Sequence, residues 1–289
     1  SDVYKRQVLK YIESFAVRKM WGRMDVDWKK VNKDVNILVG INGCGKTTLL
    51  NLIYDYYGAK KKKTNLAAEL KGNDINIPVT YIRSFDVPSN VKKKTESVLL
   101  QDLKQVVNQN GEGTSFFDYR MKMLNFPDKA PVIKERIDHF FKRINTLFAE
   151  TNKEIMIDPI SNNLVFRVVG TQERFCDSEG KGLCDSDGEA IRVQGESVQL
   201  EQLSSGEKQM LLILTTVFLQ EEKPNILLMD EPEISLHISW QEQLIVMLRK
   251  MNPHCQLILT THSPSIFVNG WEDKIVFMED LEGIDNAGK

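Results

Sequence analysis

Short runs of apolar residues are separated along this chain by longer stretches of mixed polarity. The runs VNILVG, NILLMD and QLILTT cover residues 35–40, 225–230 and 256–261. Continuous runs of this length are typical of strands that are buried on both faces of a parallel sheet. Weaker strand candidates are VLKYIESFAV (8–17), PVTYIRSF (78–85) and KIVFME (274–279).

Helical patterns follow several of these strands. INGCGKTTLLNLIYDYY turns and enters a helix after residue 40, MLLILTTVFL is an apolar helix after residue 207, and a third helix covers about 239–250. Strand–helix alternation of this kind predicts an α/β fold with a mostly parallel sheet.

The middle of the chain has a different pattern. From about residue 88 to 152 the spacing of apolar residues is helical, with stripes at Val98, Leu99, Leu103, Val106 and Val107, and at Ile133, Ile137, Phe140, Phe141, Ile144, Leu147 and Phe148. Next, NNLVFRVVG and EAIRVQG predict a hairpin insertion over about 163–194, with an acidic, glycine-rich tip. Its DSDGE stretch resembles only the start of a calcium loop, so a solvated hairpin tip is favoured.

Composition limits the class of protein. Of the 289 residues, 42% are hydrophobic and 27% charged, which predicts a packed core, and the net charge of −2 gives no strong field toward nucleic acid or membranes. No apolar run approaches the roughly 20 residues that span a bilayer, and no secretory leader is evident. The short apolar runs lead us to expect no membrane insertion. Four scattered cysteines favour a reducing cytoplasm.

The first residues of the chain resemble a sequence introduced in the laboratory. Residues 2–7 (DVYKRQ) match the translation of the transposon mosaic-end tag of sequencing libraries. We therefore expect residues 1–7 to be a cloning or assembly scar, and residues 8–289 to form a single domain.

The segment GINGCGKT at residues 40–47 fits the pattern G-x-x-x-x-G-K-[ST], with a strand before it and a helix after it. Its glycines let backbone N–H groups converge on an anion. Lys46 would reach the outer phosphates, and the Thr47 hydroxyl would bind Mg²⁺. The expected nucleotide-binding residues are Gly40, Ile41, Asn42, Gly43, Cys44, Gly45, Lys46, Thr47 and Thr48.

Two later strands end in residues suited to hydrolysis. In ILLMDEPE, Asp230 can hold Mg²⁺, and Glu231 can polarise an attacking water as a general base. In LTTHSPS, His262 ends the next strand, where it is either structural or within reach of a γ-phosphate.

The segment LSSGEKQ (203–209) precedes the apolar helix and has the composition of a helix N-terminus. Hydroxyls there cap free N–H groups, and the positive end of the helix dipole attracts an anion.

These four motifs in this order resemble the ATP-binding-cassette (ABC) ATPases, over essentially the whole chain. The resemblance implies a P-loop head with a mostly parallel sheet, an antiparallel β part and a helical lid. It implies ATP and Mg²⁺ as cofactors. It also implies a head-to-tail homodimer in which Ser204, Ser205, Gly206 and Glu207 act in trans on the neighbour's γ-phosphate.

Within this family, DEPEISLH followed by LTTHSP resembles the soluble branch that includes RecF and SMC-like heads, OLD-family ATPases, and the AAA-family ATPases of Septu and retron phage defence. The resemblance implies a role in DNA repair or phage defence, with a separate effector such as a nuclease. DNA remains an open partner, since the runs Lys60–Lys63 and Lys92–Lys94 are either solvated surface or phosphate contacts.

Several points depart from the family pattern or stay open. No glutamine follows the strand at 78–85, Cys44 replaces a small P-loop residue, and either Trp21 or Trp28 could stack on adenine. The alternatives are the ATPase subunit of a membrane transporter and a non-hydrolysing ATP-gated scaffold. The missing glutamine and the long insert before Leu203 argue against the first, and Glu231 argues against the second.

Overall fold

The computed structural model describes residues 9–58, 69–85, 96–108, 115–158, 163–169 and 197–283. The expected scar, both lysine runs, and the hairpin tip with its strand at 189–195 lie outside these residues. The chain divides into two compact units, one formed by Ser1–Lys94 with Thr216–Lys289 and the other by Thr95–Thr215.

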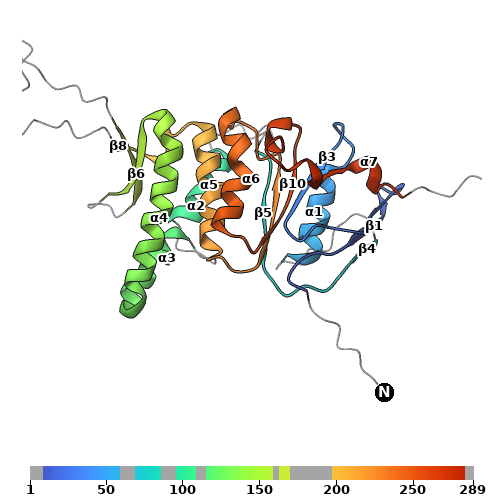
Figure 1. The fold of residues 1–289 in the computed structure, drawn as a ribbon, viewed down its shortest axis with the longest axis horizontal. Coiled ribbons are helices and arrows are strands. Elements are labelled where there is room, and N and C mark those ends of the chain that lie inside the picture. The colour runs from blue at the N-terminus through green and yellow to red at the C-terminus, as the bar shows by residue number, and fades with distance from the viewer. Residues whose placement is uncertain are drawn as a thin grey trace, which may run out of the picture. The chain divides into compact units, whose positions relative to one another are not determined.

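The first unit contains a five-stranded parallel sheet (Figure 1). Its order is β11 (Ile275–Phe277), β3 (Val35–Val39), β10 (Cys255–Thr260), β9 (Asn225–Asp230) and β5 (Val79–Ile82). Every residue of β9 and β10 is buried, as expected for continuous apolar strands in the middle of a sheet. The predicted parallel α/β sheet is confirmed. Because β10 lies between β3 and β9, three strand ends meet at one edge.

An antiparallel sheet of order β2–β1–β4 completes the β structure of this unit. Its strands are β1 (Phe15–Met20), β2 (Met24–Trp28) and β4 (Glu69–Gly72). Figure 1 shows the helix α1 (Lys46–Tyr57) between this sheet and the parallel one. Buried side chains of α1, including Leu49 and Ile53, share one core with Phe15 of β1 and with Leu228 and Ile258 of the parallel sheet.

The first strand begins later than the pattern at 8–17 predicts. The N–H of Ile12 donates to the side chain of Gln256, and the N–H of Glu13 donates to that of Asn73. Side-chain acceptors therefore take the place of a strand partner there, and the ladder starts at Phe15.

The remaining elements of the first unit are α6 (Ile238–Met251), the short helices η4 (Pro264–Ile266) and η5 (Glu272–Lys274), and α7 (Met278–Leu281). The last of these replaces the end of the strand predicted at 274–279. Helix α5 (Ser205–Leu219) begins in the second unit and ends in the first.

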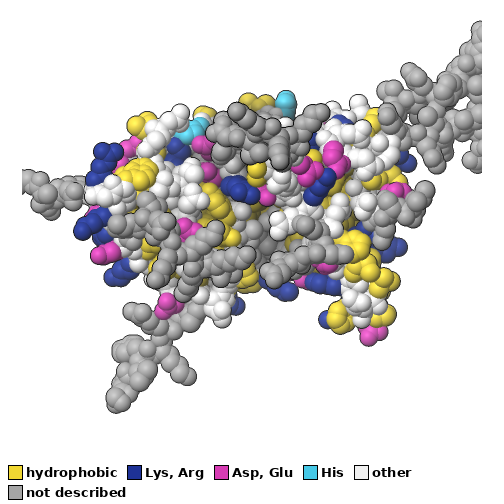
Figure 2. Space-filling view, turned by 180° about the vertical axis from the view of Figure 1, so that it is seen from behind, with side chains coloured by type: hydrophobic (Ala, Val, Ile, Leu, Met, Phe, Trp, Pro, Cys, Tyr) yellow, Lys and Arg dark blue, Asp and Glu magenta, His cyan; other side chains and the backbone are white. Residues whose placement is uncertain are grey.

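The second unit confirms the helical middle segment. Its helices are α2 (Val98–Asn108), α3 (Phe116–Asn125), η1 (Pro127–Lys129), α4 (Ala130–Phe148), η2 (Ala149–Thr151) and η3 (Leu200–Gln202). The stripe predicted over residues 133–148 faces the interior, with all of its members but Phe141 buried. At the turn between α3 and α4, hydrophobic side chains gather on the surface (Figure 2), namely Leu124, Phe126 and Val132.

A second antiparallel sheet, of order β6–β7–β8, belongs to the second unit. It contains β6 (Lys153–Ile157), β7 (Leu164–Val168) and β8 (Ser197–Val198). The predicted strand at NNLVFRVVG is thus present as β7. Its described partners, β6 and β8, were not predicted.

Among the described residues, no helix combines the length and apolar character needed to cross a bilayer.

Candidate active site

The loop between β3 and α1 is shaped around two glycines. Gly43 and Gly45 have φ values of +81° and +102°, a region that L side chains rarely adopt. A Cβ on Gly45 would also lie 2.9 Å from Cη2 of Trp21, so the loop and the indole pack closely. Helix α1 begins directly after Gly45, and its first N–H groups have no intrahelical partner. This helix start is suited to an anion.

Lys46 lies folded onto the loop. Its Nζ donates to the backbone oxygens of Gly40 at 2.9 Å and Ile41 at 3.2 Å, and the residue is only 5% exposed. Phosphate oxygens entering the loop would offer the ammonium group stronger, charge-assisted acceptors than these carbonyls.

The side chains of Thr47 and Asp230 meet although they lie 183 positions apart. The Thr47 hydroxyl donates to Oδ1 of Asp230 at 3.0 Å, and the Thr260 hydroxyl donates to the same oxygen at 2.7 Å. No group of three or more His, Cys, Asp or Glu side chains suited to a metal occurs in the described part of the chain. One carboxylate and one hydroxyl fit Mg²⁺, which takes few protein ligands and completes its shell with phosphates and water.

Glu231 directly follows β9, and its backbone is left-handed, with φ of +48°. Its N–H donates to the Thr260 hydroxyl at 3.0 Å, and its Oε1 lies 3.5 Å from Nε2 of His262. Burial raises the pKa of Glu231, and the neighbouring carboxylates of Asp230 and Glu233 raise it further, while His262 opposes them. The structure therefore brings both predicted catalytic side chains together.

Glu233, the last acidic residue of the DEPE stretch, lies beside these residues although the sequence pattern assigned it no role. It is 8% exposed, and its Oε1 accepts hydrogen bonds from the Thr261 hydroxyl and the His262 N–H, both at 2.7 Å. Its Oε2 is buried and has no hydrogen-bond partner in the described part of the chain. No signal in the sequence pairs Glu233 with His262, because the two belong to different strand ends.

An open hollow of about 920 Å³ is lined by most of these side chains, but the buried Asp230 is not part of its lining. Its lining consists of Trp21, Asn42, Gly43, Gly45, Lys46, Thr47, Thr48, Glu231, Glu233, Ile234, His262, Ser263 and Pro264. Most of the predicted P-loop residues and both predicted catalytic residues therefore face one space. Ile41 lies outside this lining, with 73% of its surface exposed.

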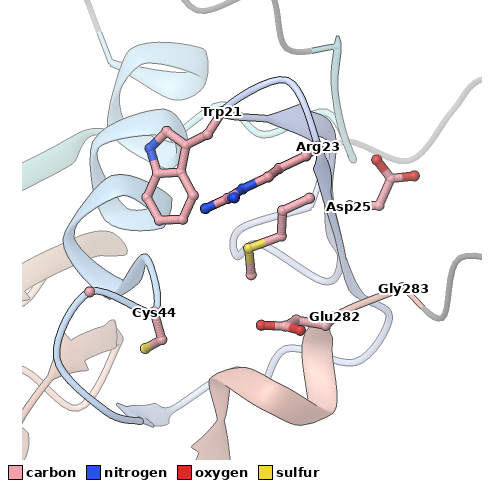
Figure 3. A pocket seen from close by; sticks show the side chains of 8 residues that line it. Trp21, Arg23, Asp25, Cys44, Glu282 and Gly283 are labelled. Atoms are coloured by element: carbon pink, nitrogen blue, oxygen red, sulfur yellow. The ribbon is translucent and has the colours of Figure 1, made fainter.

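A second hollow of about 410 Å³ adjoins the first, since both are lined by Trp21 and Gly43. Figure 3 shows Trp21 and Arg23 reaching into it from the turn between β1 and β2, opposite Cys44 and Glu282. Trp21 is 42% exposed, whereas Trp28 is 2% exposed and belongs to the core. Of the two tryptophans considered for base stacking, only Trp21 is accessible.

The segment LSSGEKQ (203–209), which the ABC resemblance predicts to be the signature segment, lies in the second unit at the start of α5. The Glu207 N–H donates to the Ser204 hydroxyl at 3.2 Å, and the Ser204 N–H donates to Oε2 of Glu207 at 2.8 Å, which forms a capping box. Ser204 and Ser205 are exposed, while Gly206 and Glu207 are buried. The Glu207 carboxylate also accepts from Lys153 Nζ at 2.8 Å, so it holds the helix start in place.

A model of the family described as AAA domain, putative AbiEii toxin, Type IV TA system matches residues 101–269, more than half of the chain. The chain therefore belongs to this family. The matched region includes the predicted signature segment (203–209), the predicted Walker B strand β9 with Asp230 and Glu231 at its end, and His262, the predicted switch histidine. The predicted P-loop (40–47) precedes it.

Two relatives are similar in sequence. The retron Vc95 probable ATPase of Vibrio cholerae serotype O1 biovar El Tor is 28% identical over 99 residues, covering 30% of this chain and 19% of that protein. The Septu protein PtuA of Bacillus thuringiensis is 20% identical over an alignment of 279 residues, covering 81% of this chain and 67% of that protein. The matched part of this chain thus spans about a fifth of the length of the retron relative.

Among solved structures, the crystal structure of the SmcHead bound to the C-winged helix domain of ScpA has a TM-score of 0.51 at 12% identity. It covers 90% of this chain and 91% of that chain. At 12% identity, this similarity shows that the two chains share a fold. The expected P-loop head with parallel and antiparallel sheets is confirmed.

Proposed function

We propose that this chain binds ATP with Mg²⁺ in the hollow above the P-loop and hydrolyses it. The observation that carries the proposal is the hydrogen bond between Thr47 and Asp230. It joins the start of the P-loop helix to the end of the Walker B strand, directly beside Glu231 and His262. Nucleotide, metal and general base would then share one space.

Each side chain has a role in this reaction. Lys46 would exchange its carbonyl acceptors for phosphate oxygens, and Thr47 with Asp230 would hold the metal. Bound Mg²⁺ would supply charge neutralisation on the phosphate oxygens. Glu231 would accept a proton from the attacking water, and the raised pKa makes its carboxylate a stronger base. His262, 3.5 Å from that carboxylate, would contact the γ-phosphate.

The base of the nucleotide would lie in the second hollow, against Trp21. The indole is exposed and packs against Gly45 at the start of α1. Any planar base can stack on such a ring, so stacking alone does not select one base over another.

The active form would be a head-to-tail homodimer. Ser204 and Ser205 are exposed at a helix N-terminus, where N–H groups and the helix dipole favour a phosphate. In an isologous pair, each signature segment would meet the partner's γ-phosphate, and two equal sites would form. The capping box of Ser204 and Glu207 would keep this helix start ordered.

The similarity to a retron ATPase and to PtuA supports a role in phage defence. We expect the ATP-bound dimer to act on a separate effector such as a nuclease, with DNA as a further candidate partner.

The test is a comparison of ATP hydrolysis by the wild-type chain and Glu231→Gln. The amide keeps the shape of the side chain but cannot accept the proton, so turnover should fall by about 10²- to 10⁴-fold while ATP still binds. The exposed residue Glu279 provides a control, since Glu279→Gln should hydrolyse ATP normally. Normal turnover of Glu231→Gln would assign the base to another residue, with His262 as the first candidate.

A further inference from the structure

We propose that Glu233 and Gln241 are positioning residues that fasten two turns together and thereby fix His262 beside Glu231. The first turn follows β9 and covers residues 231–237, and the second follows β10 and covers residues 261–263. The proposal rests on the proposed function, because it concerns how the residues around the γ-phosphate are held.

Glu233 connects the two turns through one carboxylate oxygen. Its Oε1 accepts from the Thr261 hydroxyl and from the His262 N–H, both at 2.7 Å. The Ser263 N–H in turn donates to the Thr261 hydroxyl oxygen at 2.9 Å. A single oxygen therefore orders the whole second turn, directly or through Thr261.

Gln241 connects the same two turns from helix α6. Its Nε2 donates to the backbone oxygens of Leu236 at 2.9 Å and Glu233 at 3.4 Å, both in the first turn. Its Oε1 accepts from the Ser263 hydroxyl at 2.6 Å, in the second turn. The amide side chain thus forms a second, independent link.

These links act on the catalytic geometry through the backbone of His262. The ring of His262 is 39% exposed and contacts Glu231 at 3.5 Å, so little besides its backbone fixes its direction. Hydrogen bonds to an ionised carboxylate are roughly twice as strong as neutral ones. A displacement of about 1 Å at a catalytic group can lower a rate by about a hundredfold.

Removing either link should therefore slow hydrolysis. Glu233→Met and Gln241→Met keep the side-chain length but remove the polar atoms, and each should lower kcat by about 10- to 100-fold. The affinity for Mg-ATP should stay unchanged in Gln241→Met, because Gln241 is not part of the lining of the hollow. Glu233 lines the hollow, so Glu233→Met is judged by its kcat. Glu233→Gln keeps an acceptor oxygen and should retain most of the turnover.

Matched controls are available in the same unit. Gln243 is exposed on the helix that carries Gln241, and Glu279 is exposed on α7. Gln243→Met and Glu279→Met should both keep wild-type turnover.

A double substitution separates positioning from a general structural effect. If Glu233 acts through His262, then Glu233→Met should cause no further loss of kcat in a His262→Ala background. An equal loss in both backgrounds would overturn the proposal.

Amide hydrogen exchange tests the hydrogen bonds of Glu233 without requiring ATP hydrolysis. In the nucleotide-free chain, Glu233→Met should speed exchange at residues 262 and 263, and Glu279→Met should not. Wild-type exchange in Glu233→Met would overturn the proposal even if kcat falls. A wild-type chain that neither binds nor hydrolyses ATP would instead contradict the proposed function, and the exchange measurement would still decide the positioning role.

Discussion

Two non-glycine residues that line the nucleotide hollow have left-handed backbones. Trp21 has φ of +54° and Glu231 has φ of +48°. Such conformations cost on the order of 1–3 kcal/mol each, and they persist where surrounding contacts determine them. For Glu231 the contact is the bond from its N–H to Thr260, and for Trp21 it is the packing against Gly45. In both cases the backbone turns a side chain into the hollow.

Trp21→Ala should therefore weaken ATP binding, since it removes the exposed ring on which the base would stack. Loss of one stacking contact is worth about 1–3 kcal/mol, which is a rise in Kd of roughly fivefold or more. Isothermal titration with Mg-ATP measures this, and Trp21→Phe should keep most of the affinity. Inorganic triphosphate should bind both variants equally, whereas an unchanged Kd for ATP in Trp21→Ala would remove Trp21 from the base site.

The start of α5 depends on a buried ion pair within the second unit. The Glu207 side chain is 2% exposed and that of Lys153 is 21% exposed, and their charged groups are 2.8 Å apart. Burial alone would raise the pKa of Glu207, but hydrogen bonds from Lys153, from the Ser204 N–H and from the hydroxyls of Thr151 and Ser204 outweigh it, and the net pKa lies below its usual value of 4.5. The signature helix is thus held by an element that is far from it in sequence.

This pair predicts how stability depends on pH. Because the folded-state pKa of Glu207 is lowered, its contribution is fully present above about pH 4.5 and is lost as the pH falls through the lowered value. Glu207→Ala should lower the free energy of unfolding by roughly 3 kcal/mol at pH 7. The loss should shrink below pH 4.5 in urea titrations.

Glu154→Ala is the matched control, because Glu154 pairs with Arg167 at an exposed position and such pairs contribute little. Equal destabilisation by the two substitutions at pH 7 would contradict the role of Glu207.

At the scale of the whole molecule, the predicted site residues are divided between the two units. The P-loop, Asp230, Glu231 and His262 belong to the first unit, and the signature serines to the second. The proposed dimer would combine the first unit of one chain with the second unit of its neighbour, so each site would need intact residues from both chains.

Mixing two inactive variants tests this arrangement. Ser204→Glu places a carboxylate against the partner's γ-phosphate and should block closure by charge repulsion, while Lys46→Ala should lose ATP binding. Each variant should be inactive alone, and the mixed dimer should regain one intact site, formed by the P-loop of the first and the signature of the second. ATPase assays and sedimentation of mixtures measure the rescue. Activity of Ser204→Glu alone, or no rescue at any ratio, would mean that the segment does not act in trans.

Much of the fold follows from the sequence, because continuous apolar runs and helical stripes report burial directly. The strand predicted over 78–85 is present as the shorter β5, and the stripe predicted over residues 133–148 lies within α4. The strands β3, β9 and β10 and the helices α1 and α6 were predicted close to their observed bounds. The short strands β2, β4 and β6 were not, because half-buried antiparallel strands of four to five residues have no distinctive period. Their formation depends on the partner strands that tertiary structure supplies.

The P-loop, the Walker B carboxylates and the helix start at Ser204 could be predicted from the sequence, because each is a local pattern formed by neighbouring residues. How these segments meet depends on contacts between residues that are far apart in the chain. The position of β10 between β3 and β9 brings Thr260 onto Asp230 and His262 onto Glu233, contacts that span 30 and 29 positions respectively. The tertiary structure also shows that Trp21 is exposed and Trp28 is buried, because the burial of a tryptophan depends on what packs over it and not on its neighbours in the chain.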